Sequence, residues 1–179
     1  MVSLKSEIAQ ARPFASPQEE ALLNLMRTAD CLNRAMQRKT REWGVTNTQY
    51  NVLRILRGAH PQGLPCSVIG ERMITAEPDI TRLVGRLKVL KLVRQQRDRH
   101  DRRVVWTQIT EAGLELLKGM DPIVDKLPGE LLGHLDTEQN AQLIQLLELA
   151  RKGCDGGRAK PTCDGTGDAK AVTCDGHKA

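Results

Sequence analysis

Seven consecutive residues at positions 97–103 carry a high density of charge. The stretch reads Arg-Asp-Arg-His-Asp-Arg-Arg, so four arginines and a histidine surround two aspartates. Like charges held this close repel one another, and folding gains nothing from collecting them. Guanidinium groups bind phosphate oxygens well, and neighbouring carboxylates can orient them. The residue types therefore predict that this stretch binds an external anion.

The segment just before this stretch predicts a helix with one apolar and one basic face. With 3.6 residues per turn, the apolar face of helix 78–91 carries Ile80, Leu83, Val84, Leu87 and Leu90. The opposite face carries Thr81, Arg82, Gly85 and Arg86. Residues 82–103 hold nine Lys or Arg against two Asp, a net charge of +7, whereas the whole chain has +5. The positive charge is therefore concentrated in this helix and the charged stretch.

A helix-turn-helix followed by a hairpin would position these charges. A short helix at 66–73 and the basic helix 78–91 form the helix-turn-helix, and strands at 93–97 and 104–109 form a wing around the charged stretch. Apolar spacing and capping residues predict the flanking helices, at 16–43, at 46–59, from 110 onward and at 136–152. The long flanking helices are apolar on one side, and we expect them to cover each other in a dimer. The predicted fold class is mainly α, with a small β-hairpin wing on a winged helix-turn-helix and a helical dimerisation region.

Composition narrows the class of partner. Aromatic residues make up only 2% of the chain, which argues against stacking of unpaired bases and leaves double-stranded DNA as the favoured partner. Five cysteines fit a reducing compartment, and the start has no secretory pattern, so we expect a cytoplasmic protein without a membrane partner. The chain has no phosphate-binding glycine loop, zinc-protease helix or nucleophile elbow, and we expect neither an enzyme nor a cofactor.

Three motifs in order resemble the MarR family of winged helix-turn-helix regulators. They are TNTQYNVLRIL at 46–56, ITRLVGRLKVLKLVRQQRDRHDRR at 80–103 and VVWTQITEAG at 104–113. Asp98, Asp101 and Arg103 match the family's wing pattern, and the resemblance spans residues 20–150. His100 departs from it, standing where the family usually has an arginine that enters the minor groove. Either Arg99 or Arg102 takes over that role, or wing affinity rises as His100 becomes protonated.

The resemblance implies a homodimeric repressor on a pseudo-palindromic operator. The predicted DNA-binding residues are Thr81, Arg82, Arg86, Arg99, His100, Arg102 and Arg103, with Asp98 and Asp101 orienting the wing. Arg103 could instead pair with one of these aspartates. The implied release signal is a small aromatic or phenolic ligand at the junction of the dimerisation helices and the DNA-binding lobe. The candidate pocket residues there are Met36, Arg41, Trp43 and Tyr50, which could equally be packing or surface residues.

Cysteine oxidation is an alternative release signal. Cys66 opens a short helix, which favours a lowered thiol pKa, whereas Cys31 lies within the first long helix. A further alternative is a protein that binds DNA without sequence preference, or a scaffold whose basic face meets a protein partner.

The predicted domain organisation has three parts. They are a flexible arm at 1–15, a MarR-like domain at 16–152 and a disordered tail at 153–179. Within the domain, 16–45 and 110–152 form the dimerisation helices and 46–109 the winged helix-turn-helix. The tail repeats Cys-Asp-Gly three times and has little apolar content. Its cysteines and His177 are too widely spaced for a typical zinc site, so we expect no metal.

Overall fold

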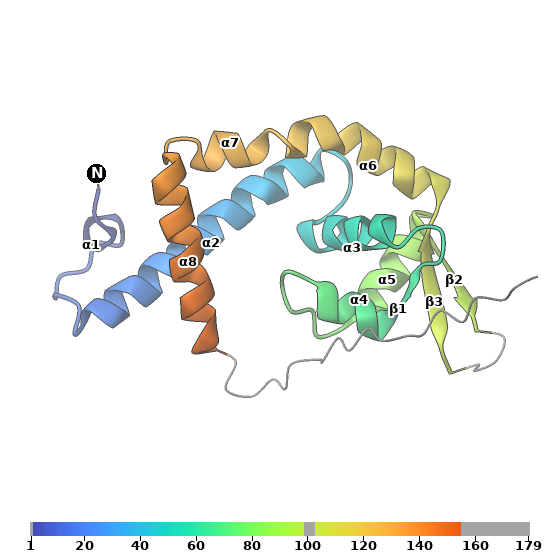
Figure 1. Cartoon of the computed structure of the whole chain (residues 1–179), viewed down its shortest axis with the longest axis horizontal. Coiled ribbons are helices and arrows are strands. Elements are labelled where there is room, and N and C mark those ends of the chain that lie inside the picture. The colour runs from blue at the N-terminus through green and yellow to red at the C-terminus, as the bar shows by residue number, and fades with distance from the viewer. Residues whose placement is uncertain (1, 99–102, 155–179) are drawn as a thin grey trace, which may run out of the picture. The chain divides into compact units, whose positions relative to one another are not determined.

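The computed structural model describes residues 2–98 and 103–154, and Figure 1 shows its elements. The chain divides into two units, with the boundary between His134 and Leu135. The helices described in the first unit are α1 (Leu4–Glu7), α2 (Pro17–Arg41), α3 (Asn47–Gly58), α4 (Cys66–Arg72), α5 (Ile80–Val89), α6 (Glu111–Val124) and α7 (Leu127–Leu132). Its strands are β1 (Leu64–Pro65), β2 (Val93–Arg97) and β3 (Val105–Ile109).

Side-chain caps begin the long helices where the sequence predicts. Ser16 Oγ accepts a hydrogen bond from a backbone N–H in the first turn of α2 at 3.1 Å. Thr46 and Gln49 form a reciprocal capping box at the start of α3, and Thr110 caps α6. These bonds satisfy N–H groups that have no partner inside the helix. Local sequence is therefore sufficient to place these starts.

The three strands form one antiparallel sheet in the order β1-β3-β2. The β2–β3 hairpin pairs over all five residues of each strand, as the wing prediction requires. β1 pairs Leu64 with Thr107 on the other edge of β3, and the sequence did not predict it. A strand of two residues is too short to show an alternating pattern, so nothing in the local sequence predicts it. β1 forms because its partner strand lies beside it, more than forty residues away in the chain.

One apolar core joins α3, α4, α5, the sheet and α6. Leu53 of α3, Ile69 of α4, Leu87 of α5 and Leu117 of α6 are completely buried in it. Figure 1 shows α3, α4 and α5 gathered beside the sheet. Burying side chains of this size stabilises the fold by roughly 1.5–3 kcal/mol each. The core holds α5 by its apolar side, which leaves its other face outward.

Three details differ from the expectations. α5 begins at Ile80, two residues later than expected, because the Asp79 side chain caps it. Leu90 was expected on the apolar face but follows the last residue of α5 and is 47% exposed. α6 continues through Pro122, although a proline inside a helix removes one backbone hydrogen bond. The mainly helical class with a small β wing is confirmed.

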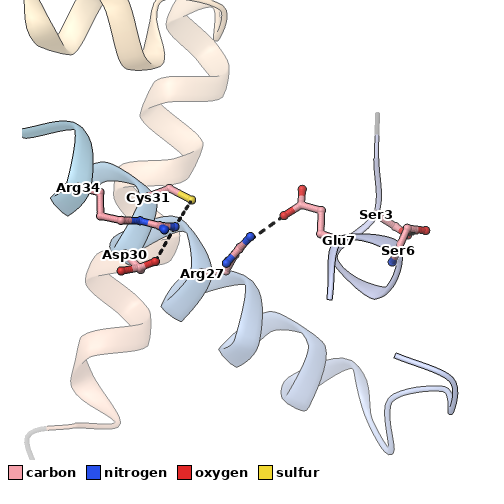
Figure 2. Close-up of polar contacts among 7 residues, drawn as sticks. All are labelled: Ser3, Ser6, Glu7, Arg27, Asp30, Cys31 and Arg34. Atoms are coloured by element: carbon pink, nitrogen blue, oxygen red, sulfur yellow. Dashed lines mark hydrogen bonds and ion pairs between the residues drawn. The ribbon is translucent and has the colours of Figure 1, made fainter. Parts of the chain in front are cut away.

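The predicted flexible arm at 1–15 contains the one-turn helix α1. Leu4 is buried, and the Glu7 carboxylate lies 3.6 Å from Arg27 Nε of α2 (Figure 2). Both charged side chains are more than two-fifths exposed, so this ion pair contributes little stability. Part of the arm therefore contacts α2.

The second unit contains α8 (Thr137–Lys152). Asp136 and Gln139 form a capping box at its start, as the sequence predicts, and no α8 residue is buried. Residues 155–179, which include most of the Cys-Asp-Gly tail, lie outside the described part of the chain. Among the described helices, none has the length and apolar character needed to cross a bilayer.

Candidate nucleic-acid interface

The outward face of α5 carries the side chains that the sequence assigned to DNA. Thr81, Arg82 and Arg86 are all exposed, whereas Leu83 and Leu87 on the other side are buried. Asp79 Oδ1 accepts the Arg82 backbone N–H at 2.8 Å, which fixes the first turn. The arrangement presents a short, rigid helix with two guanidinium groups on its free face, and a major groove admits such a helix.

The segment between α4 and α5 is anchored to α3. Asn51 Oδ1 of α3 accepts a hydrogen bond from the Ile74 backbone N–H at 3.0 Å. α4 and α5 also pack on each other and on α3. The hydrogen bond adds a polar contact that holds the turn against α3. The orientation of α5 is therefore set by packing on both sides of the turn.

The wing begins with a contact that the sequence did not predict. The Trp106 indole Nε1–H of β3 donates to Asp98 Oδ2 at 3.0 Å, and the pair is partly buried. The Asp98 backbone N–H also donates to the Val104 carbonyl at 2.9 Å. Asp98, expected to orient arginines, thus receives an indole donor at the base of the wing. The tryptophan in a strand next to the charged stretch was the signal that could have revealed this bond.

The tip of the wing lies outside the described residues. Arg99, His100, Asp101 and Arg102 all fall there, so their predicted roles stay predictions. Arg103, the first described residue after the tip, is exposed. On the sheet itself, Arg94 Nε donates to Gln108 Oε1 at 2.9 Å across the two strands. This contact ties the hairpin together behind the tip.

A cavity of about 620 Å³ lies between α2, α3 and residues 73–75. Met36 and Tyr50 line it, as predicted for a ligand pocket, but Arg41 and Trp43 do not. Arg41 is exposed, and the Trp43 ring packs near Gly119 of α6. The guanidinium at the cavity is that of Arg34, which the sequence did not single out.

The cavity is lined by both apolar and polar side chains, one of them charged. The Arg34 Nη2 atom lies 2.8 Å from Asp30 Oδ2, and both side chains are more than half exposed. Burial raises the pKa of the Tyr50 phenol above its usual range, and the nearby Arg54 guanidinium partly offsets this rise. The phenol is therefore neutral at physiological pH. Besides apolar side chains and the Arg34 cation, the cavity lining includes the hydroxyl groups of Thr48, Tyr50 and Thr75 and several amide groups. Such a mixture of apolar surface and polar groups is typical of small-molecule sites.

The two candidate redox cysteines have different surroundings. Cys31 is exposed on α2, and Arg34 Nη2 donates to its Sγ at 3.7 Å (Figure 2). Cys66 is half-buried at the start of α4, with Sγ 3.9 Å from Thr107 Oγ1. Over residues 2–98 and 103–154, no group of three or more His, Cys, Asp or Glu is placed to hold a metal ion.

Comparison with known proteins gives a consistent assignment. The family model described as MarR family matches residues 43–104, which include α3 to α5 and most of the wing. The HTH-type transcriptional regulator MhqR of Bacillus subtilis (strain 168) is 28% identical over 124 residues, which cover 69% of this chain and 84% of that protein. The organohalide-sensing regulator RdhR in its 2,4-dichlorophenol-bound form shares the fold, with a TM-score of 0.71 at 13% identity over 80% of this chain and 87% of that one.

One solved structure is similar enough to decide the family. It is the crystal structure of a MarR transcription factor from Planctomyces limnophilus, with 39% sequence identity and a TM-score of 0.60. The match covers 76% of this chain and 99% of that one. The exposed basic face of α5, the hairpin beside it and this identity together show that the chain belongs to the MarR family of transcriptional regulators.

Proposed function

We propose that this DNA-binding transcriptional regulator represses its target genes by placing α5 in the major groove of a specific operator. The observation that carries the proposal is the outward face of α5, where Thr81, Arg82 and Arg86 are exposed above a buried apolar side. Thr81 and Arg82 lie in the first turn and would reach base edges, while Arg86 would contact the backbone. The wing arginines would meet phosphates and the adjacent minor groove.

The acting species in this proposal is a homodimer. Leu22 and Met26 of α2 are 57% and 62% exposed, and α8 exposes Ile144, Leu146 and Leu149. Aliphatic side chains left open on helices favour burial against another surface. Two symmetric copies would present two α5 helices and read half-sites about one helical turn, roughly 34 Å, apart. A pseudo-palindromic operator follows from this symmetry.

The proposed release signal is a small aromatic or phenolic ligand in the cavity beside Tyr50. Its support is the lining of Met36, Tyr50 and Arg34, together with the 2,4-dichlorophenol that RdhR binds on the same fold. A ligand there would touch both α2 and α3, and would change the angle between dimerisation helix and DNA-binding lobe. Oxidation of Cys31 or Cys66 is the alternative signal.

In this proposal the regulator has no catalytic activity. It works in the cytoplasm, because its target is chromosomal DNA. Its support is the class of its relatives, which are transcriptional regulators.

Fluorescence anisotropy tests the proposal. Duplex DNA from upstream of the protein's own gene is compared with a scrambled duplex at two salt concentrations. The parent should prefer the upstream duplex, and Arg82→Ala should lose about tenfold or more in affinity, since a base-reading guanidinium is worth roughly 1–3 kcal/mol. Arg38→Ala, which removes an exposed arginine from α2, is the matched control and should bind as the parent does.

Other outcomes would point to other functions. Equal, steeply salt-dependent binding to both duplexes would be the signature of a protein that binds DNA without sequence preference, unless a selected duplex restores discrimination. Absence of binding to either duplex would favour the protein-partner scaffold and would contradict the proposal.

A further inference from the structure

The outermost line of α5 contains a glycine, so one position on this face carries no side chain. Gly85 lies one helical turn after Thr81 and one turn before Val89, on the side opposite the buried Leu83 and Leu87. A Cβ atom built on Gly85 would meet no atom within 4 Å. An open hollow of about 540 Å³ lies beside Gly85 and is lined by Gln49, Arg82, Gly85, Arg86, Val89 and Leu90.

Two aliphatic side chains border this hollow on a face that is otherwise basic. Val89 is 82% exposed and Leu90 is 47% exposed. Neither contributes much to the core, whose α5 residues are Leu83, Val84 and Leu87. Covering exposed aliphatic groups with another apolar group removes their surface from water and lowers the free energy. The hollow therefore has the chemistry of a recess for a small apolar group.

The flanking charges indicate what kind of molecule carries that group. Arg82 and Arg86 lie along the same hollow, and their guanidinium groups attract phosphates. In the major groove of DNA, base edges present hydrogen-bond donors and acceptors and one apolar group, the C5 methyl of thymine. A surface that combines two arginines with an aliphatic recess is complementary to a groove that contains thymine.

We propose that the hollow over Gly85 receives a thymine C5 methyl group, so that Gly85 and Val89 select an A·T pair in each half-site. The missing side chain at Gly85 lets the methyl group approach the α5 backbone, and Val89 provides an apolar wall. This inference rests on the proposed function, since it requires α5 to lie in the major groove.

Replacing thymine by deoxyuridine tests the inference directly. The full-length protein is first used to enrich tight-binding duplexes from a randomised pool. Each thymine of the enriched duplex is then exchanged, one at a time, for 2′-deoxyuridine, which lacks only the C5 methyl. At one thymine in a half-site the exchange should weaken parent binding about three- to fivefold, the value of one buried methyl group.

Gly85→Ala is the diagnostic variant, because its added methyl group projects into the part of the hollow next to the α5 backbone, where the thymine methyl group would approach. It should bind the thymine duplex more weakly and lose the deoxyuridine penalty at that one position. Gly58→Ala makes the same change on α3, where a Cβ also meets no atom within 4 Å, and should behave as the parent. Alanine is the better helix former, so both variants should keep or raise the thermal midpoint.

The possible results separate the inference from the proposed function. Enrichment of a specific sequence with no methyl-sensitive thymine, or a full penalty retained in Gly85→Ala, overturns the inference alone and leaves the hollow to a ligand other than DNA. Enrichment of no sequence at all overturns both.

Discussion

Trp106 places an indole N–H donor on a carboxylate at the base of the wing. Its Nε1 lies 3.0 Å from Asp98 Oδ2, and Asp98 is the last described residue before the charged tip. A hydrogen bond to an ionised group is stronger than one between neutral groups. Trp106 therefore positions the start of the tip, although it need not touch DNA itself.

Trp106→Phe keeps an aromatic ring and removes the donor. We expect operator affinity to fall about tenfold, because a hydrogen bond to a charged group contributes roughly 1.5 kcal/mol and its loss leaves the wing less well placed. Anisotropy titrations measure the affinity, and a thermal midpoint close to that of the parent shows that the fold is retained.

Trp43→Phe is the matched control for this prediction. The Trp43 ring packs near Gly119 in α6 and lies far in sequence from the wing. It should therefore leave operator affinity unchanged. Equal affinity of Trp106→Phe and the parent would show that other contacts hold Asp98 in place.

At the scale of elements, α3 and α6 are joined by a charged pair as well as by the core. Arg57 Nη1 of α3 donates to both carboxylate oxygens of Asp121 in α6, at 2.9 and 2.8 Å. The two side chains are 35% and 36% exposed, so water screens part of their attraction. The pair connects α3 of the helix-turn-helix region to α6, a predicted dimerisation helix.

A double-mutant cycle with Arg57→Ala and Asp121→Ala should give a coupling free energy of about 0.5–1 kcal/mol. This value allows for two close N–O contacts and for the partial exposure of both groups. Urea unfolding measures it. The pair between Lys118 and Glu115, 3.8 Å apart and more than 70% exposed on both sides, is the control and should give a coupling near zero. Equal couplings would mean that the Arg57 pair has no special role.

At the scale of the whole molecule, α2 and α8 leave aliphatic side chains exposed, and such side chains favour burial against another surface. Leu22, Leu25 and Met26 follow one another along α2, and all three are exposed. The proposed homodimer covers such side chains and also supplies the second α5 that a palindromic operator needs. Dimerisation and operator recognition are thus expected to fail together.

Met26→Glu should convert the dimer to a monomer. Burying an unpaired carboxylate in an apolar interface is costly, so association should weaken by two orders of magnitude or more. Sedimentation equilibrium measures the mass, and anisotropy should show weaker operator binding. Asn24→Glu changes an exposed polar residue of the same helix and should remain dimeric. A monomeric parent would contradict the proposed assembly.

Much of this molecule was predictable from short stretches of sequence. The caps at Ser16, Thr46 and Thr110 act within one turn, and apolar spacing within a helix acts over a few turns, so the helix limits were predicted to within a few residues. The wing hairpin was also predicted, because its two strands are short neighbouring stretches of the chain. The resemblance to the MarR family is confirmed. The DNA-contact residues on α5 lie on its outward face, but their contacts with DNA stay predictions.

The sequence by itself determined the order of elements, their caps and the basic face of α5, because these depend on residues close together in the chain. Only the tertiary structure decided which distant residues meet: β1 beside β3, and Arg57 on Asp121, which is 64 positions away. It likewise placed Arg34, not Arg41, at the cavity beside Tyr50. Such contacts arise when packed elements bring side chains within a few ångströms, and no local pattern encodes that packing.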